Sequence, residues 1–146
     1  MIAFNFPVTD FTIKEKGGQS FIFDGIRKKW ILLTSEEWVR QNMARYLVVE
    51  RKYPATLIAL EKNLDLNGLK KRFDILVYDA RHQPWMLVEC KAPQVPLSDA
   101  VLQQVLRYNI SIPVPYIVIS NGNSTFGWVK EHGVLKKLEA MPAWPE

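Results

Sequence analysis

Three charged residues interrupt strand-like runs of otherwise apolar side chains. Asp74 lies within one such run, and Glu89 and Lys91 lie at the end of the next. Because side chains alternate between the two faces of a strand, Glu89 and Lys91 point the same way. If the loop between the runs has four residues, 80–83, Asp74 lies opposite Glu89, whereas a five-residue loop places it opposite Cys90. In the first register, two carboxylates and an ammonium group converge.

Such a cluster has a recognisable chemistry. Two close carboxylates repel each other unless a cation lies between them, and carboxylate oxygens with open water positions are usual ligands of Mg²⁺. The ion would polarise a phosphoryl oxygen and lower the pKa of a bound water, which Lys91 could orient or deprotonate. This is the chemistry of phosphodiester hydrolysis. The spacing equally allows an exposed pair of Glu89 and Lys91 with Asp74 as a solvated neighbour.

Two helices and a series of strands are expected to position these residues. Thr34 and Glu37 have the spacing of a capping box, which predicts a helix that ends before Pro54, and Ser98 can cap a second helix that ends before Pro113. Strands are predicted at 21–23, 30–33, 57–64, 73–79, 85–91, 116–120, 125–130 and 134–138. This order predicts an α/β fold with a mixed sheet flanked by helices.

The composition fits one domain, residues 1–146. The chain is 48% hydrophobic and 23% charged, and its length suffices for a core without disulfides or a structural metal. The pattern of residues 1–20 predicts that this segment is an irregular or edge-strand leader. No run is long enough to span a membrane, and the N-terminus lacks the pattern of a secretory signal. With one cysteine, Cys90, the chain fits a reducing compartment, and we expect it in the cytoplasm.

Five ordered motifs resemble those of a known nuclease superfamily. The motifs are Leu33 to Gln41, Lys71 to Ile75, Leu87 to Pro93, Gln104 to Asn109, and Ser120 to Gly122. Together they resemble the PD-(D/E)xK nucleases, and in particular the N-terminal nuclease domain of type I restriction enzyme R subunits in a stand-alone form. The resemblance covers about residues 25–130 and implies a restriction-endonuclease-like core in the order α-β-β-β-α-β. The chain lacks the phosphate-binding loop of an ATP-driven motor.

The resemblance assigns roles to individual residues. It implies that Asp74, Glu89 and the backbone carbonyl of Cys90 bind Mg²⁺, for which Mn²⁺ could substitute, and that Lys91 assists the attacking water. Glu37 matches an outer metal ligand of the first helix, although it also suits a capping role. Gln104 and Tyr108, one helical turn apart, match a motif that faces the site and the DNA, although ordinary helix packing and solvation would also account for them.

The charge pattern suggests a polyanionic partner. The net charge is +4, and short basic runs include Lys70, Lys71 and Arg72, directly before the run that carries Asp74. These residues could contact a phosphate backbone, most simply that of double-stranded DNA. Cleavage of both strands needs two active sites, so a homodimer is a reasonable hypothesis. The tryptophans, Trp30 among them, fit core or flanking positions better than base-stacking positions.

Two other functions stay open from the sequence. The domain could bind nucleic acid without cutting it, or it could dock onto a larger restriction or repair complex. Loss of metal binding with intact DNA binding would identify the first, and failure to bind DNA at low salt would favour the second. The sequence therefore predicts a Mg²⁺-dependent DNA endonuclease related to restriction or DNA defence, with these two alternatives.

Overall fold

The structure consists of two β-sheets and two long helices. It is a computed structural model that describes residues 1–6 and 10–146. The helices are α1 (Ser35–Val49) and α2 (Asp99–Asn109), with a short 3-10 turn at Ala55–Leu57. The strands are β1 (Ile13–Lys16), β2 (Gln19–Asp24), β3 (Lys29–Leu32), β4 (Ile58–Leu66), β5 (Leu69–Tyr78), β6 (Pro84–Cys90), β7 (Tyr116–Ser120), β8 (Thr125–Glu131) and β9 (Val134–Lys137). None of the described helices is long and apolar enough to cross a membrane.

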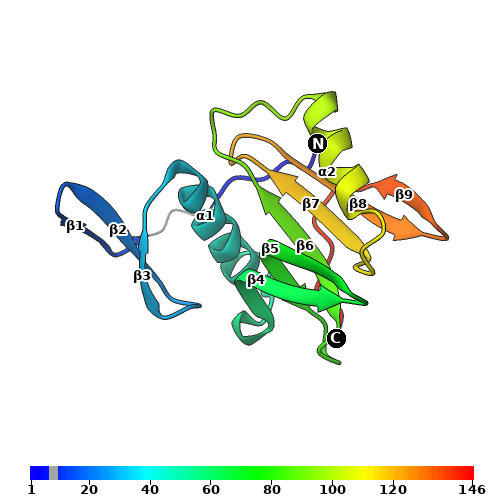
Figure 1. The fold of residues 1–146 in the computed structure, drawn as a ribbon, viewed down its shortest axis with the longest axis horizontal. Helices are drawn as coiled ribbons and strands as arrows, with labels where there is room; N and C mark the ends of the chain where they lie inside the picture. Colours follow the sequence, from blue (N-terminus) through cyan, green and yellow to red (C-terminus); the bar gives the residue numbers. More distant parts are fainter. Residues whose placement is uncertain (7–9) are drawn as a thin grey trace.

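The larger sheet has six strands in the order β4-β5-β6-β7-β8-β9. Its strands pair antiparallel except for β6 and β7, which are parallel. A parallel pair needs a long crossover, and α2 supplies it between these two strands. The order α1-β4-β5-β6-α2-β7 confirms the predicted α/β architecture with a mixed sheet (Figure 1).

The two helices cover opposite faces of this sheet. On one face, α1 contributes Val39, Met43 and Leu47 to a core that includes alternate residues of β6, namely Met86, Val88 and Cys90. On the other face, α2 contributes Leu102, Val105 and Leu106 to a core that includes Leu87. The predicted alternation along β6 is thus confirmed, and Glu89 and Lys91 follow Leu87 on the α2 face.

Both helices begin at the predicted caps. The Thr34 hydroxyl accepts a hydrogen bond from the Glu37 backbone N–H at 3.0 Å, and the Ser98 hydroxyl accepts one from Val101 at 3.4 Å. These bonds satisfy N–H groups that have no partner within the helix. The start of α1 at Ser35 places Glu37 in the first turn of the helix.

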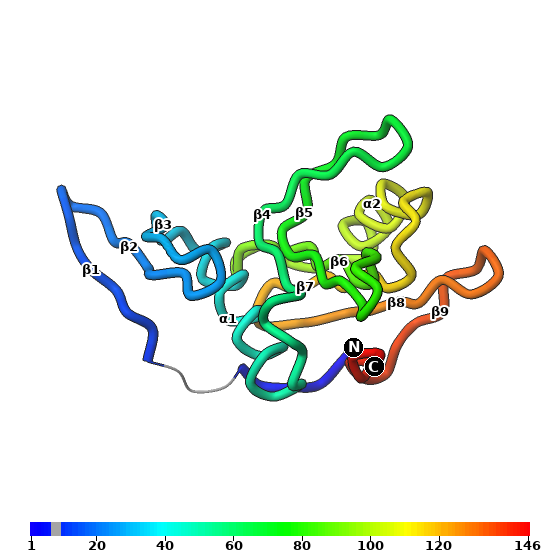
Figure 2. Tube along the Cα trace, turned by 90° about the horizontal axis from the view of Figure 1, so that it is seen from below, coloured from blue at the N-terminus to red at the C-terminus, as the bar shows by residue number. Residues whose placement is uncertain are grey.

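The basic residues 70–72 lie within a strand and not, as expected, in a loop that precedes one. Asn67 and Gly68 have positive φ angles of 54° and 85°, which suit a two-residue hairpin turn. Because this turn is short, Leu66 pairs with Leu69, and β5 begins four residues earlier than the predicted run at 73. The resulting β4–β5 hairpin extends beyond the rest of the sheet (Figure 2).

The smaller sheet, β1-β2-β3, lies on the far side of α1 from the larger sheet (Figures 1 and 2). The predicted hairpin at 21–33 is confirmed as β2 and β3, and the predicted leader contains the edge strand β1. Residues 7–9 of that leader lie outside the described residues. Asp24, fully buried at the end of β2, links this sheet to α1 because its Oδ2 accepts a hydrogen bond from Gln41 at 3.0 Å.

Asp24 is held in its ionised form. Burial opposes its charge, but hydrogen bonds from the Arg27 backbone and side chain and from Gln41 outweigh that effect, so the pKa of Asp24 lies below its ordinary value of 3.8. A carboxyl whose pKa is lowered on folding contributes stability above the unfolded pKa and loses it as the pH falls through the folded pKa.

We expect Asp24→Asn to lower the free energy of unfolding by about 1–3 kcal/mol at pH 7, because Arg27 loses one of its two buried charged partners. Urea unfolding between pH 3 and pH 7 measures this. The difference from wild type should shrink below about pH 4 as Asp24 itself becomes protonated. Asp10→Asn, at an exposed position, is the control. A constant difference across this range would show that the charge of Asp24 is not what stabilises the contact.

Candidate functional site

The strands β5 and β6 separate at the residues singled out by the sequence. Their ladder includes the pairs Leu76–Leu87 and Ile75–Val88 and does not continue, so Asp74 stands opposite Glu89 just beyond its end. This is the register expected for a four-residue loop, although the pairing shifts at the Val77/Tyr78 bulge. The site therefore lies in a fork between two neighbouring strands.

The Asp74 carboxylate bridges this fork. Its Oδ2 accepts a hydrogen bond from the Cys90 backbone N–H at 2.8 Å, so a side chain replaces the bond that a strand partner would make. Its Oδ1 accepts a hydrogen bond from the Arg40 guanidinium of α1 at 3.1 Å. Asp74 is thus fixed between β6 on one side and α1 on the other.

Glu89 and Lys91 line a cleft beside α2, of about 340 Å³, which we call the α2 cleft. Its lining residues are Lys71, Glu89, Lys91, Val101, Gln104, Val105, Tyr108 and Asn109. The structure therefore brings together Glu89, Lys91, Gln104 and Tyr108, which the sequence assigned to one site. Tyr108 is 67% exposed and packs beneath the Lys71 ammonium, 4.3 Å from the ring centroid, which ordinary helix packing does not explain.

Glu89 is a half-buried carboxylate with two lysines near it. Burial is the main reason that its pKa is raised above the ordinary value of 4.5, and the nearby charge of Asp74 adds to the effect against opposing contributions from Lys71 and Lys91. No hydrogen bond contributes to this shift. A half-buried carboxylate close to a second carboxylate favours a cation beside it.

A second cleft, of about 650 Å³, lies beside α1 and contains Asp74. This α1 cleft is lined by Ile31, Leu32, Thr34, Ser35, Glu36, Glu37, Arg40, Glu61, Arg72, Asp74 and Ala92. Asp74 and Glu89 thus face two different clefts on either side of the fork. Their charges still repel each other across the fork.

Arg40 occupies the centre of the α1 cleft. Its buried guanidinium contacts Glu37, Glu61 at 2.9 Å, Glu36 at 3.3 Å and Asp74 at 3.1 Å. Burial opposes the charge of Arg40, but the carboxylates of Glu37 and Asp74 outweigh that effect and raise its pKa. Arg40 therefore stays charged and holds four carboxylates in one group.

Glu37 belongs to this ion-pair group. Its side chain is 3% exposed and accepts hydrogen bonds from Arg27 at 2.8 Å and from Gln41 at 2.9 Å, besides its contact with Arg40. Its backbone N–H donates a hydrogen bond to the Thr34 hydroxyl, which is one of the two contacts of the expected capping box. The structure thus places Glu37 among cations and not beside Glu89.

Glu61 was not identified from the sequence, yet it connects three elements. Its carboxylate pairs with Arg27 at 3.4 Å, with Arg40 at 2.9 Å and with Arg72. Its backbone has a positive φ of 50° in the middle of β4, between the pairs Leu60–Ile75 and Lys62–Phe73, so that it lies opposite Asp74. A non-glycine residue in this conformation costs of order 1–3 kcal/mol and is typical of functional sites.

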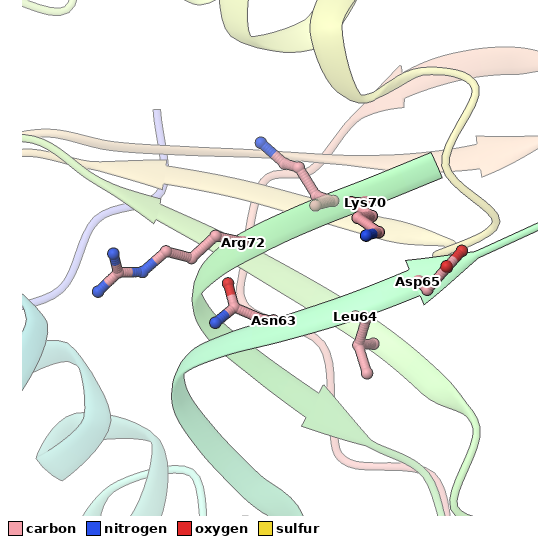
Figure 3. A pocket seen from close by; sticks show the side chains of 6 residues that line it. Asn63, Leu64, Asp65, Lys70 and Arg72 are labelled. Atoms are coloured by element: carbon pink, nitrogen blue, oxygen red, sulfur yellow. The ribbon is translucent and has the colours of Figure 1, made fainter. Parts of the chain in front are cut away.

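The basic residues of β5 divide between two surfaces. Lys71 lines the α2 cleft, whereas Lys70 and Arg72 lie with Asn63, Leu64 and Asp65 along a shallow hollow of about 450 Å³ on the hairpin, which Lys71 also borders. Figure 3 shows the Lys70 and Arg72 side chains projecting from the same strand, with Asp65 at the hairpin end. This arrangement lines the approach to the fork with cationic groups.

The oxygen donors at the fork are of the chemical kind that binds magnesium, and the Asp74 carboxylate is already bonded to Arg40 and to the Cys90 N–H. Asp74, Glu89 and the Cys90 carbonyl are hard ligands on adjoining positions of two strands, and Mg²⁺ typically takes one or two carboxylates and keeps several waters. Among the described residues, no group of three or more His, Cys, Asp or Glu side chains is arranged to hold a metal ion by itself. Burial raises the pKa of the Cys90 thiol, which stays protonated. The donor set is therefore unlike that of a zinc site.

The residues missed by sequence reasoning are Arg40 and Glu61. Glu61 carried a signal like that of Asp74, because it is a charged residue directly after an apolar strand run, Ile58 to Leu60. Arg40 carried a weaker signal, because it interrupts the apolar stripe of α1. Neither position, taken alone, reveals its partners, which come from other elements.

Comparison with protein families identifies a family to which the chain is similar. Residues 35–145 match the family described as Type I restriction enzyme R protein N terminus. The matched segment contains α1, the whole of the larger sheet and the whole α2 cleft, and it leaves out the smaller sheet, whose Ile31 and Leu32 line the α1 cleft. No curated protein matches the chain.

We expect Glu89→Gln to raise the free energy of unfolding at pH 7 by about 1 kcal/mol, because it removes a half-buried charge that burial and Asp74 disfavour more than the nearby lysines favour it. A carboxyl whose pKa is raised on folding contributes to stability while protonated and loses that contribution as the pH rises through the folded pKa. In urea unfolding, the increase in the free energy of unfolding of Glu89→Gln over wild type should therefore grow from pH 4 to pH 8. The exposed variant Glu139→Gln should show no such trend, and a less stable Glu89→Gln would reveal a structural partner for this carboxylate.

Proposed function

Since the chain belongs to the Type I restriction enzyme R protein N-terminus family, we propose that it is a metal-dependent endonuclease that hydrolyses phosphodiester bonds of double-stranded DNA. The observation that carries this proposal is the fork between β5 and β6. There Glu89 lies near Asp74 and shares a cleft with Lys91 and Gln104. Carboxylates of this kind, beside an ammonium group, suit phosphoryl transfer.

In this proposal, Asp74, Glu89 and the backbone carbonyl of Cys90 hold Mg²⁺ or Mn²⁺. The ion, when bound, polarises a phosphoryl oxygen and lowers the pKa of a water. Lys91 is a catalytic residue whose ammonium orients the attacking water and stabilises the negative charge that develops on the phosphate. Gln104 positions the phosphate or the water from the α2 side of the same cleft.

The protein surface around the fork would hold the DNA backbone. Lys70, Lys71 and Arg72 extend along one strand of the projecting hairpin, and Tyr108 lies against Lys71 at the mouth of the α2 cleft. Contacts of this kind to phosphates are independent of sequence and weaken steeply with salt. Cleavage of both strands would require a second copy, and a homodimer is the simplest way to supply it.

The α1 cleft would complete the site from the other side. Asp74 can take a cation only if Arg40 shifts away from its Oδ1, and the three other carboxylates around Arg40 offer that guanidinium alternative partners. Glu37 would act in this proposal as an outer ligand of the metal through water. Its contacts with Arg27 and Gln41 hold it ready in one position.

The ion pair between Arg40 and Asp74 also favours a second candidate function. Both oxygens of Asp74 already have hydrogen-bond donors, so the same fold could hold nucleic acid through its basic hairpin without binding metal or cutting. A domain of this kind would serve within a larger restriction complex. Metal binding distinguishes the two functions.

We expect the wild type to nick supercoiled plasmid in Mg²⁺ or Mn²⁺ but not in EDTA. Lys91→Ala should lower the cleavage rate by about 100-fold or more, because it removes the group that assists proton transfer and charge stabilisation. DNA binding in Ca²⁺, measured by fluorescence anisotropy, should change little. Lys136→Ala, an exposed lysine of β9, should leave both cleavage and binding as in wild type.

Metal binding has a separate readout in thermal unfolding. A cation that binds only the folded protein at ten times its dissociation constant adds about 1.4 kcal/mol. Mg²⁺ or Ca²⁺ should therefore raise the Tm of the wild type and of Lys91→Ala but not that of Asp74→Asn. Wild type that binds DNA in a salt-sensitive way but neither cuts nor responds to metal would establish the non-cutting function instead.

A further inference from the structure

The smaller sheet has a buried face and an open face. Ile22 and Asp24 of β2 are fully buried toward α1, so their neighbours point the opposite way. The open face carries Phe21, Phe23, Trp30 and Leu32, which we call the aromatic face. The register pairs Phe23 with Trp30 and Phe21 with Leu32 across β2 and β3.

The aromatic face exposes large apolar side chains side by side. Phe23 is 38% exposed, Trp30 37% and Leu32 42%, and the rings of Phe23 and Trp30 pack edge to face with centroids 5.4 Å apart. Trp30 was expected at a core or flanking position, whereas Trp85 and Trp128, each 8% exposed, are the ones that are buried. A contiguous exposed aromatic patch is typical of a binding surface.

The surroundings of this face are cationic. Lys14 and Lys16 of β1 alternate onto the same side, and the Lys14 ammonium lies 4.2 Å from the centroid of the Trp30 ring. Lys28 and Lys29 add two exposed charges at the β2–β3 turn. The only acidic residues between 13 and 32 are Glu15 and Asp24, of which Asp24 is buried. Aromatic rings among lysines suit a single nucleic-acid strand, whose bases stack and whose phosphates pair with the ammonium groups.

The aromatic face is also continuous with the proposed nuclease site. Leu32, at the end of β3, lines the α1 cleft that contains Asp74. The smaller sheet lies outside the matched family segment, which begins at residue 35, so the family match assigns nothing to it. A strand that leaves the fork beside Asp74 would therefore reach Phe21 and Leu32 first and then Phe23 and Trp30.

We propose that the aromatic face binds an unpaired stretch of nucleic acid next to the site of cleavage. This inference rests on the proposed nuclease function and adds a substrate preference to it, for DNA that has a single-stranded segment beside a duplex. One base stacks on Trp30 in place of the Lys14 ammonium, which then contacts the neighbouring phosphate. The exposed edge of Phe23 limits where that base can slide.

The test measures the binding of a labelled oligothymidylate and a labelled duplex of equal length, both in Ca²⁺, by fluorescence anisotropy. Trp30→Ala should weaken single-strand binding by about 5- to 100-fold, the range for loss of one base–aromatic stack, and leave duplex binding nearly unchanged. Trp30→Phe keeps a stacking ring and should retain most of the affinity. Trp38→Ala removes another exposed tryptophan, 41% exposed on α1, and serves as the control.

The outcomes separate this proposal from the nuclease proposal. Unchanged single-strand binding in the folded double variant Phe23→Ala with Trp30→Ala overturns the aromatic face as a stacking surface, as does an equal loss for single strands and duplex. If the wild type is a dimer and Trp30→Ala is a monomer, the aromatic face contacts a second copy of the chain, and this result overturns the proposal. Selective loss of single-strand binding supports it, even where plasmid cleavage by the wild type is absent and the nuclease proposal fails.

Discussion

The hydrogen bond from the Cys90 backbone to the Asp74 side chain sets the geometry of the whole site. It forms where β5 leaves β6, at a position where a sheet would otherwise place a backbone carbonyl. The bond satisfies a donor that would be costly to bury alone, so the strands can part without an orphaned N–H group. The same carboxylate that lets the sheet open is thereby placed opposite Glu89. The Asp74 side chain thus both supports the backbone of β6 and presents a charged group at the site.

A network of ion pairs connects the elements around this fork. Asp24 comes from the smaller sheet, Arg40 from α1, Glu61 from β4 and Asp74 from β5, and the arginines hold these carboxylates together across the α1 cleft. Ionic contacts of this kind in a partly buried setting contribute little net stability, but removal of one member leaves the others unpaired. The smaller sheet is therefore joined to the domain by charge as well as by packing. Its position and the position of Asp74 are set by the same contacts.

The sequence predicted the order of elements, both helix caps and the residues of the fork, because each depends on a local pattern. Asp74 and Glu89 stood out as charges in apolar runs, and alternation along β6 decided which side Glu89 faces. The register depended on a turn whose bulge at Val77 and Tyr78 has no signature in the residues. The role of Arg40 could not be predicted, since its partners Glu61 and Asp74 are 21 and 34 residues away. The basic residues 70–72 were placed before a strand because the tightness of the Asn67–Gly68 turn was not recognised.

The backbone at Glu61 shows that this domain is not optimised for its own folding. Glycine adopts a positive φ without steric cost, and asparagine tolerates it better than glutamate does. An engineer who improved the chain one position at a time for thermal stability would replace Glu61 early. That change would relax β4 but remove the one carboxylate that Arg27, Arg40 and Arg72 share next to Asp74. A stabilised scaffold obtained in this way would keep its fold and lose the arrangement of its cleft.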